Sequence, residues 1–191
     1  AASLRQPFND NSYLWHVRAG DLQLAEKAVV TADPFSFTRA GSAWRTQSWL
    51  AELLYSRLDS WLGLQAPRLI VTILATLLFL LIGLIAYRRS RSVPSVVLFL
   101  TASAIVIAGF LVPRPVIFSL ALLAAVVVAD SDRRMRWTLP VLMWAWASVH
   151  ASFALGLAYL ALRAVGRGIG WKRLIDLFIV GLPTLVTAHG L

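Results

Sequence analysis

Long apolar runs separated by short arginine clusters constrain this chain more than any other feature of its sequence. Leu69–Tyr87 is nineteen apolar or small residues between Arg68 and Arg88, about the length of helix that crosses the hydrocarbon of a bilayer. A second such run, Val93–Val112, ends at Pro113. Three further apolar runs cover residues 116–129, 137–162 and 174–191. With 59% hydrophobic residues and a mean hydropathy of +0.72, the chain lies outside the range of soluble globular domains. The sequence therefore predicts an all-α fold, a polytopic transmembrane helical bundle.

The charged residues predict how these runs are oriented. Residues 1–68 hold seven Lys and Arg residues against six acids, whereas residues 69–191 hold eleven against three. In the second part the arginines gather in turns between apolar runs, as they do on the cytoplasmic side of membrane proteins. The two clearest clusters are Arg88, Arg89 and Arg91, and Arg133, Arg134 and Arg136. The net charge of +9 thus points to membrane lipids, and we expect no nucleic-acid partner.

The same rule divides the long apolar run at 137–162. If this run crossed the membrane once, the basic residues that follow it would lie outside, against the rule. The conflict disappears if the run rises to His150 and returns as two short helices. We therefore predict a multi-pass protein of the cell membrane in two parts. Residues 1–68 form an extracytoplasmic loop with juxtamembrane helices, and residues 69–191 form about four spans plus a short hairpin at 137–163.

Two surface helices are expected within the loop. Gln47–Leu62 carries an apolar stripe, and Gly63 is placed to end the helix. The polar face opposite that stripe consists of Ser48, Glu52, Ser56 and Asp59. Such a helix is too polar to span a bilayer and is expected to lie in the plane of the interface. Asp21–Val30 predicts a second, weaker surface helix.

Two aspartates in the loop are candidates for acid–base chemistry. A carboxylate at a membrane surface can act as a general base toward an incoming hydroxyl group. Ordinary structural roles compete with this function. Asp10 could cap a helix that begins near Ser12, and Asp33 could form a turn before Pro34.

Basic side chains are candidates for binding an anionic substrate. Arg18, Arg45 and Arg114 could hold a phosphate, because guanidinium groups bind phosphate oxygens in bidentate fashion, or could contact lipid headgroups. His16 could bind a substrate or a metal, although packed histidines are commoner than ligating ones. The sequence shows neither a metal-ligand motif nor a nucleotide-binding glycine motif. We expect no cofactor, with a divalent metal as an open alternative.

Two further residues are candidates because of where they stand in the chain. Trp44 could stack on a sugar ring or anchor the loop at the interface. His150 interrupts a membrane segment, and polar groups at such places are functional candidates, although a hydrogen bond to a nearby carbonyl is the simpler alternative.

The order of these motifs resembles the GT-C superfamily of membrane glycosyltransferases, which use polyprenyl-phosphate sugars as donors. It is most similar to bacterial, often actinobacterial, proteins with the pattern D…WH-x-x-x-G…DPFS-[FY]-T…W…WL-x-E. This chain carries that pattern at Asp10, Trp15, His16, Gly20, 33–38, Trp44, Trp49, Leu50 and Glu52. The segment W-A-S-V-H at 146–150 is similar to the family's W-A-N-x-H, with Ser148 in place of Asn. Arg114 and Pro115 match an Arg-Pro pair of the family. Pro183, His189 and Gly190 resemble its later P…N-P-Y-G motif, in which the Asn, Pro and Tyr have diverged.

The resemblance implies an inverting transferase of the cell envelope, with Asp10 as the catalytic aspartate. It implies that Arg18, Arg45 and Arg114 stabilise the leaving phosphate, that Asp33 and His16 position the sugar or the acceptor, and that Glu52 orders the loop. It also implies that the chain is an N-terminal fragment that lacks the first helix. The chain departs from the many members with two acids at this place, because Asn11 and Ser12 follow Asp10. That departure favours the alternative of a non-catalytic membrane subunit, or a protein that binds a lipid-linked sugar within a membrane-protein complex. A small transporter is a weaker alternative.

Overall fold

The part of the chain that the structure describes is all-α. The computed structural model describes residues 12–44, 46–168 and 170–186. Its helices are α1 (Ser12–Glu26), α2 (Trp49–Leu62), α3 (Ala66–Ser90), α4 (Val93–Ile107), α5 (Val116–Ser131), α6 (Leu139–Val149), α7 (Phe153–Gly166) and α8 (Trp171–Gly181). Short 3-10 turns follow α2, α4 and α8 and precede α6. These ranges contain no β-strand beyond one isolated bridge between Ala32 and Ala43, so the predicted all-α class is confirmed.

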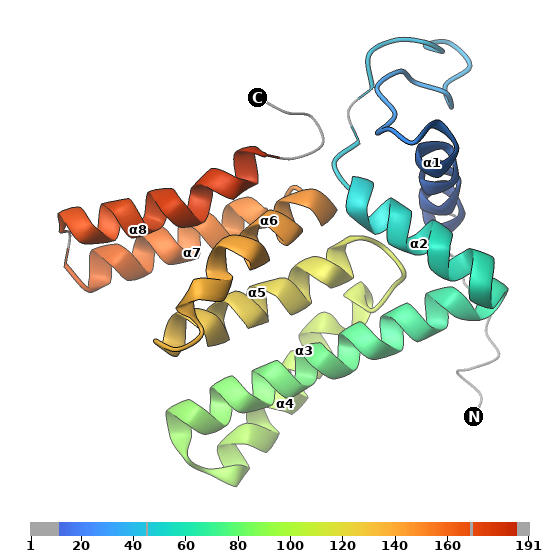
Figure 1. Ribbon diagram of the computed structural model, residues 1–191. Coiled ribbons are helices and arrows are strands. Elements are labelled where there is room, and N and C mark those ends of the chain that lie inside the picture. Colours follow the sequence, from blue (N-terminus) through green and yellow to red (C-terminus); the bar gives the residue numbers. More distant parts are fainter. Residues whose placement is uncertain (1–11, 45, 169, 187–191) are drawn as a thin grey trace.

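The helices run between two chemically different ends of the molecule. Figure 1 shows α3, α5, α6, α7 and α8 side by side, with α1 and α2 gathered at one end. The turns that join α3 to α4, α5 to α6 and α7 to α8 lie at the opposite end (Figure 1). We call the end that holds α1 and α2 the cap end. It consists of residues 12–62 and the turns at 111–115 and 150–152. The second is the basic end, because arginines occupy its turns.

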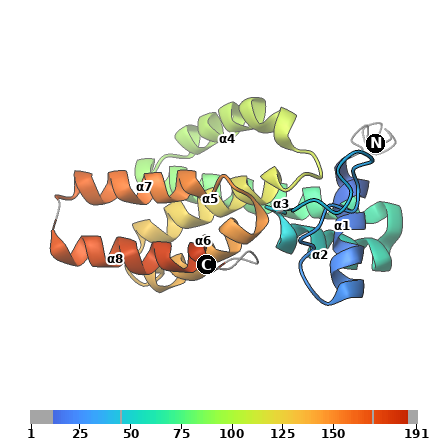
Figure 2. The ribbon, with the colours of Figure 1, turned by 90° about the horizontal axis from the view of Figure 1, so that it is seen from above.

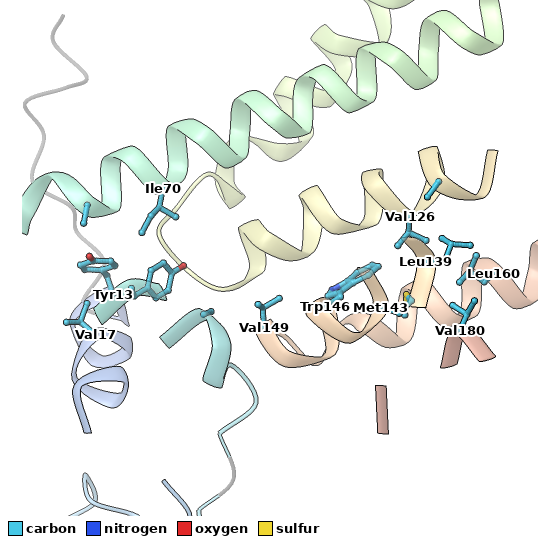
Figure 3. Packing of buried hydrophobic residues seen from close by; sticks show 14 residues of the cluster. Tyr13, Val17, Ile70, Val126, Leu139, Met143, Trp146, Val149, Leu160 and Val180 are labelled. Carbon is cyan, nitrogen blue, oxygen red and sulfur yellow. The ribbon is translucent and has the colours of Figure 1, made fainter. Parts of the chain in front are cut away.

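One hydrophobic core joins the two ends. It begins with Tyr13 and Tyr55 between α1 and α2, and it continues through Trp146 on α6 to Val180 on α8 (Figure 3). Gly156 allows α7 to approach α6 closely, because a Cβ atom at this position would lie 2.6 Å from the Trp146 indole. The core crosses the expected boundary at residues 68 and 69, and α2 leads into α3 through one 3-10 turn at Gly63–Gln65.

Within the described residues, two helical segments are long and apolar enough to cross a membrane. They are Trp49–Ser90, in which α2 leads into α3, and Val93–Phe110. Shorter apolar helices cover Val116–Ser131, Phe153–Gly166 and Leu174–Leu185. No residue of α4 is buried, and large apolar side chains such as Leu98 and Val106 are exposed along it. Figure 2 shows α4 on the outside of the bundle. Where the sequence predicts a break at His150, the chain forms α6 and α7 with His150 in the turn between them.

The loop helices differ from expectation in two respects. The expected helix at 21–30 is wrong in its bounds, because one helix runs from Ser12 to Glu26. α2 ends as expected at Gly63, which has a positive φ of 54°. The second difference is the face that α2 turns toward the rest of the protein. Its polar residues pack against α1, while apolar side chains such as Trp61 are exposed. The reason is that α1 offers polar partners on its own α2-facing side.

Candidate functional site

The cap end is built on a close crossing of α1 and α2 at Gly20. A Cβ atom at this position would lie 2.1 Å from the backbone oxygen of Glu52 and 2.7 Å from the Cβ of Ser56. Only glycine therefore allows the two backbones to approach this closely. One turn earlier on the same side of α1 stands His16, since residues four apart share a helix face. The spacing WH-x-x-x-G thus brings His16 and Gly20 together against α2.

Glu52 is the buried centre of this crossing. Its side chain is 1% exposed, and its Oε2 accepts a hydrogen bond of 2.5 Å from the Gln23 amide. The Thr46 hydroxyl donates to Oε1 at 2.7 Å. The Nδ1 atom of His16 lies 3.5 Å from Oε1 and has no hydrogen-bond partner among the described residues. Both neutral partners come from outside α2, so Glu52 ties α1 and the segment before α2 to this helix.

Two further polar contacts fix α1 against α2. The hydroxyl of Ser56 donates to Asp21 at 2.6 Å, and the hydroxyl of Tyr13 donates to Asp59 at 3.0 Å. Burial raises the pKa of Tyr13 well above its usual value, and the bond to Asp59 raises it further. Tyr13 therefore stays neutral and donates its proton throughout the physiological range.

Aromatic rings form a cluster beside His16. The ring of Trp15 lies 5.2 Å from Phe35 and 5.6 Å from Trp44, measured between centroids, and Phe35 lies 6.0 Å from Trp44. The imidazole of His16 meets Trp15 edge-on at 5.0 Å. All three large rings are half-buried. Partly exposed indole faces of this kind are suited to stacking on an apolar face of a ligand.

Asp33 holds together the loop that presents Phe35 and Trp44. Its Oδ1 accepts hydrogen bonds from the backbone N–H groups of Phe35 at 2.8 Å and Ser36 at 3.0 Å. Its backbone N–H donates to Ser42, and that of Trp44 donates to Thr31, which closes the loop. Hydrogen bonds from the Ser36 side chain, and then from the backbone N–H groups of Ser36 and Phe35, lower the pKa of Asp33. The structure thus places Asp33 in a turn, the alternative to substrate binding that its sequence context leaves open.

His150 approaches the cap from the turn between α6 and α7. Burial lowers the pKa of His150, and the nearby imidazole of His16 lowers it further. The backbone N–H of Ser152 donates to Nδ1 of His150 at 3.1 Å, and the Trp146 indole donates to the Ser152 hydroxyl at 3.2 Å. With Nδ1 accepting, the neutral ring carries its proton on Nε2. Two histidines that lie 134 positions apart in the sequence are therefore near enough for His16 to influence the pKa of His150.

The remaining predicted site residues are less well placed by the structure. Asp10 and Arg45 lie outside the described residues. Arg18 is exposed on α1, on the turn that carries His16 and Gly20. Arg114 is exposed in the turn between α4 and α5. That turn lies at the cap end, since Phe118 of α5 packs on Tyr55 of α2 with a centroid distance of 5.7 Å.

The basic end holds a charged cluster that the sequence reasoning missed. Asp130 is 4% exposed, and three arginines contact its carboxylate. The distances are 2.9 Å to Arg136, 3.0 Å to Arg163 and 2.9 Å to Arg167, which binds both carboxylate oxygens. One signal was available: Asp130 is an acid near the end of an apolar run, just before the arginine cluster at 133–136. Its partners could not be read from spacing, because two of them lie 33 and 37 positions away.

Neither a metal group nor a known relative identifies this site. Within residues 12–44, 46–168 and 170–186, no three His, Asp or Glu side chains gather in a way that could hold a metal ion. Comparison of the chain with protein families, curated proteins and solved structures finds no match.

Proposed function

We propose that this protein is an integral-membrane glycosyltransferase of GT-C type, or the N-terminal part of one. It transfers a sugar from a polyprenyl-phosphate donor to an acceptor hydroxyl group with inversion. One observation carries the proposal. The loop residues of the D…WH-x-x-x-G…DPFS…W…WL-x-E pattern that the structure describes gather at the cap end, where His150 of the W-A-S-V-H segment also lies. Residues far apart in the sequence thus gather at one end of the molecule, as a substrate site requires.

In the proposed reaction the carboxylate of Asp10 takes the proton from the acceptor hydroxyl. The acceptor oxygen then bonds to the anomeric carbon of the sugar, and the bond from that carbon to the phosphate oxygen breaks. The electron pair of the broken bond leaves with polyprenyl phosphate. Arg18, Arg45 and Arg114 stabilise the negative charge that develops on the leaving phosphate. We expect this reaction to need no cofactor.

The described residues suggest how the sugar is held. In the sequence Asp10 precedes the first residue of α1 by two positions, and His16 follows one turn into that helix. The cluster of Trp15, Phe35 and Trp44 supplies aromatic faces for the sugar ring. The proton on Nε2 of His150 is a hydrogen-bond donor for a sugar hydroxyl. Asp33 and Glu52 act by holding the loop and the α1–α2 crossing in shape.

The proposed topology places the cap end outside the cytoplasm. α3 and α4 cross the bilayer, and the shorter apolar helices α5 and α8 complete a multi-pass module. The helices α6 and α7 form the short hairpin, which reaches the cap at His150. The concentration of arginines in the turns of the opposite end supports this orientation.

The test is sugar transfer by the complete protein in proteoliposomes, with radiolabelled polyprenyl-phosphate sugars as donors and cell-envelope extracts as acceptors. Asp10→Asn removes the general base with almost no change in size, and we expect the transfer rate to fall at least about 100-fold. Glu26→Gln is the matched control, because Glu26 is exposed at the far end of α1. Its rate should equal that of the wild type.

Two results would separate the alternatives. Unchanged transfer by Asp10→Asn would exclude Asp10 as the base. Retention of the labelled donor without any transfer by the wild type would instead favour the non-catalytic subunit that binds a lipid-linked sugar.

A further inference from the structure

Three arginines line a cavity between α3, α5 and α7 at the basic end. The cavity has a volume of about 310 Å³. Its lining consists of Ile85, Arg88, Arg89, Val128, Ser131 and Arg163. No acidic side chain is part of this lining. A cavity of this kind between helices favours an anionic occupant.

The neighbouring acids do not neutralise these arginines. Arg163 shares Asp130 with two other arginines, and Arg88 lies 3.8 Å from the partly exposed Asp132. Arg89 has no ion pair among the described residues. Four arginines therefore share two aspartates and Arg89 has no acidic partner, which leaves an excess of three positive charges in this region. An anion that enters the cavity therefore meets Arg89, which has no ion pair among the described residues, beside Arg88 and Arg163, whose aspartate partners do not balance the positive charge of this region.

A second cavity nearby shows what a balanced lining looks like. It has a volume of about 460 Å³ and lies beside α6, α7 and α8. Its charged lining residues are Asp130, Asp176, Arg136 and Arg167, two of each sign. This difference in charge assigns the anion to the cavity at Arg89 rather than to its larger neighbour.

The arginine cavity is also amphipathic. Ile85 lies one helical turn before Arg88 and Arg89 on α3, and Val128 lies one turn before Ser131 on α5. The inner wall is therefore apolar, while the cations stand toward the helix ends. The phosphate of a lipid with acyl chains matches this arrangement, because its chains can lie against the apolar wall. A soluble phosphate has no apolar part to contact that wall.

We propose that this cavity binds the phosphate group of an anionic phospholipid headgroup. The arginines contact the phosphate oxygens by charge-assisted hydrogen bonds, and the first carbons of the lipid lie against Ile85 and Val128. The proposal requires that these helices lie in a bilayer. It does not depend on glycosyl transfer, because the cavity lies at the end opposite the cap.

The test is a titration of the full protein, purified in a neutral detergent, with phosphatidylglycerol and with phosphatidylcholine, read by native mass spectrometry. We expect tighter binding of phosphatidylglycerol. Arg89→Gln should weaken that binding about tenfold, the effect of losing one hydrogen bond between charged groups. Arg133→Gln is the matched control, because it removes the same charge from an exposed turn of the same end outside the cavity. It should change the affinity less than about twofold.

Arg89→Lys keeps the charge and should recover part of the affinity, because an ammonium group cannot bind two oxygens in a fixed plane. Melting temperatures of all variants should match the wild type, since Arg89 takes no part in the Asp130 cluster. Equal losses in Arg89→Gln and Arg133→Gln would overturn the proposal in favour of diffuse surface charge. Complete displacement of phosphatidylglycerol by inorganic phosphate would overturn the lipid as the source of the phosphate.

Discussion

The two ends of this molecule each bury one carboxylate, and they surround it in opposite ways. At the cap end Glu52 is 1% exposed and is held by an amide and a hydroxyl group, with the His16 imidazole nearby. At the basic end Asp130 is 4% exposed and is held by three guanidinium groups. Neutral groups thus satisfy the Glu52 carboxylate, whereas the Asp130 carboxylate contacts more positive charge than it can balance.

This difference fits different tasks. Glu52 fixes the α1–α2 crossing through an amide and a hydroxyl group, with no guanidinium group among its contacts in the described residues. The surplus of arginine around Asp130 makes the opposite end attractive to anions. The same chemical group therefore orders a polar site in one place and anchors a basic surface in the other.

Asp130→Asn should be the most damaging of these substitutions. It removes the charge that three arginines share and leaves them close together without a counter-ion. We expect a loss of about 3 kcal/mol in the free energy of unfolding in detergent, because removing one partner of a buried ion pair strands the other. An unchanged stability would show that solvent already compensates the arginines.

Gly20→Ala should be nearly as harmful at the cap end. The added Cβ would overlap the backbone oxygen of Glu52, so α1 and α2 must move apart. We expect a loss of about 2 kcal/mol from this overpacking. Gly83→Ala in α3 is the control. A Cβ atom added at Gly83 would lie 3.8 Å from its nearest neighbour, a flexible methyl group of Leu100 on α4. It should leave the apparent melting temperature unchanged or raise it slightly.

Glu52→Gln should cost less than Asp130→Asn, although Glu52 is the more deeply buried. The Gln23 amide can turn over to present its oxygen to the new side chain, whereas the arginines cannot become acceptors. We expect a loss of about 1 kcal/mol in the free energy of unfolding, measured in detergent as for Asp130→Asn. A loss larger than that of Asp130→Asn would contradict the contrast between the two ends.

Much of this architecture could be predicted because it depends on local sequence. The apolar run at 69–87 lies within α3, and the helix that Gly63 ends was expected from its spacing. The long-range contacts of Glu52 and Asp130 could not be predicted, since Gln23 and Arg163 lie on other helices, 29 and 33 positions away. The orientation of α2 could not be predicted for the same reason. Its polar stripe indicates a solvent-facing side only if no neighbouring helix offers polar partners. His16 and His150 are each candidates from the sequence, but no spacing predicts that His16 would influence the pKa of His150.

The smallest expected effect is a dependence on pH at the loop that Asp33 closes. Because hydrogen bonds hold the pKa of Asp33 below its unfolded value of 3.8, its stabilising effect is present above that value. The effect is lost as the pH falls through the lower, folded-state pKa. Asp33→Asn cannot ionise, so the difference in melting temperature between the wild type and this variant should shrink from pH 6 to pH 3. A difference that stays constant would show that the charge of Asp33 contributes nothing to the loop.

The claim that the two ends face opposite sides of the membrane has a direct test, because the chain contains no cysteine. Phe37→Cys places one thiol on the exposed loop of the cap end, and Arg134→Cys places one in an exposed turn of the basic end. In intact cells that express the full protein, a membrane-impermeant maleimide should label Phe37→Cys and leave Arg134→Cys unlabelled. In inverted vesicles the labelling should reverse. Labelling of both thiols from the same side would contradict the account.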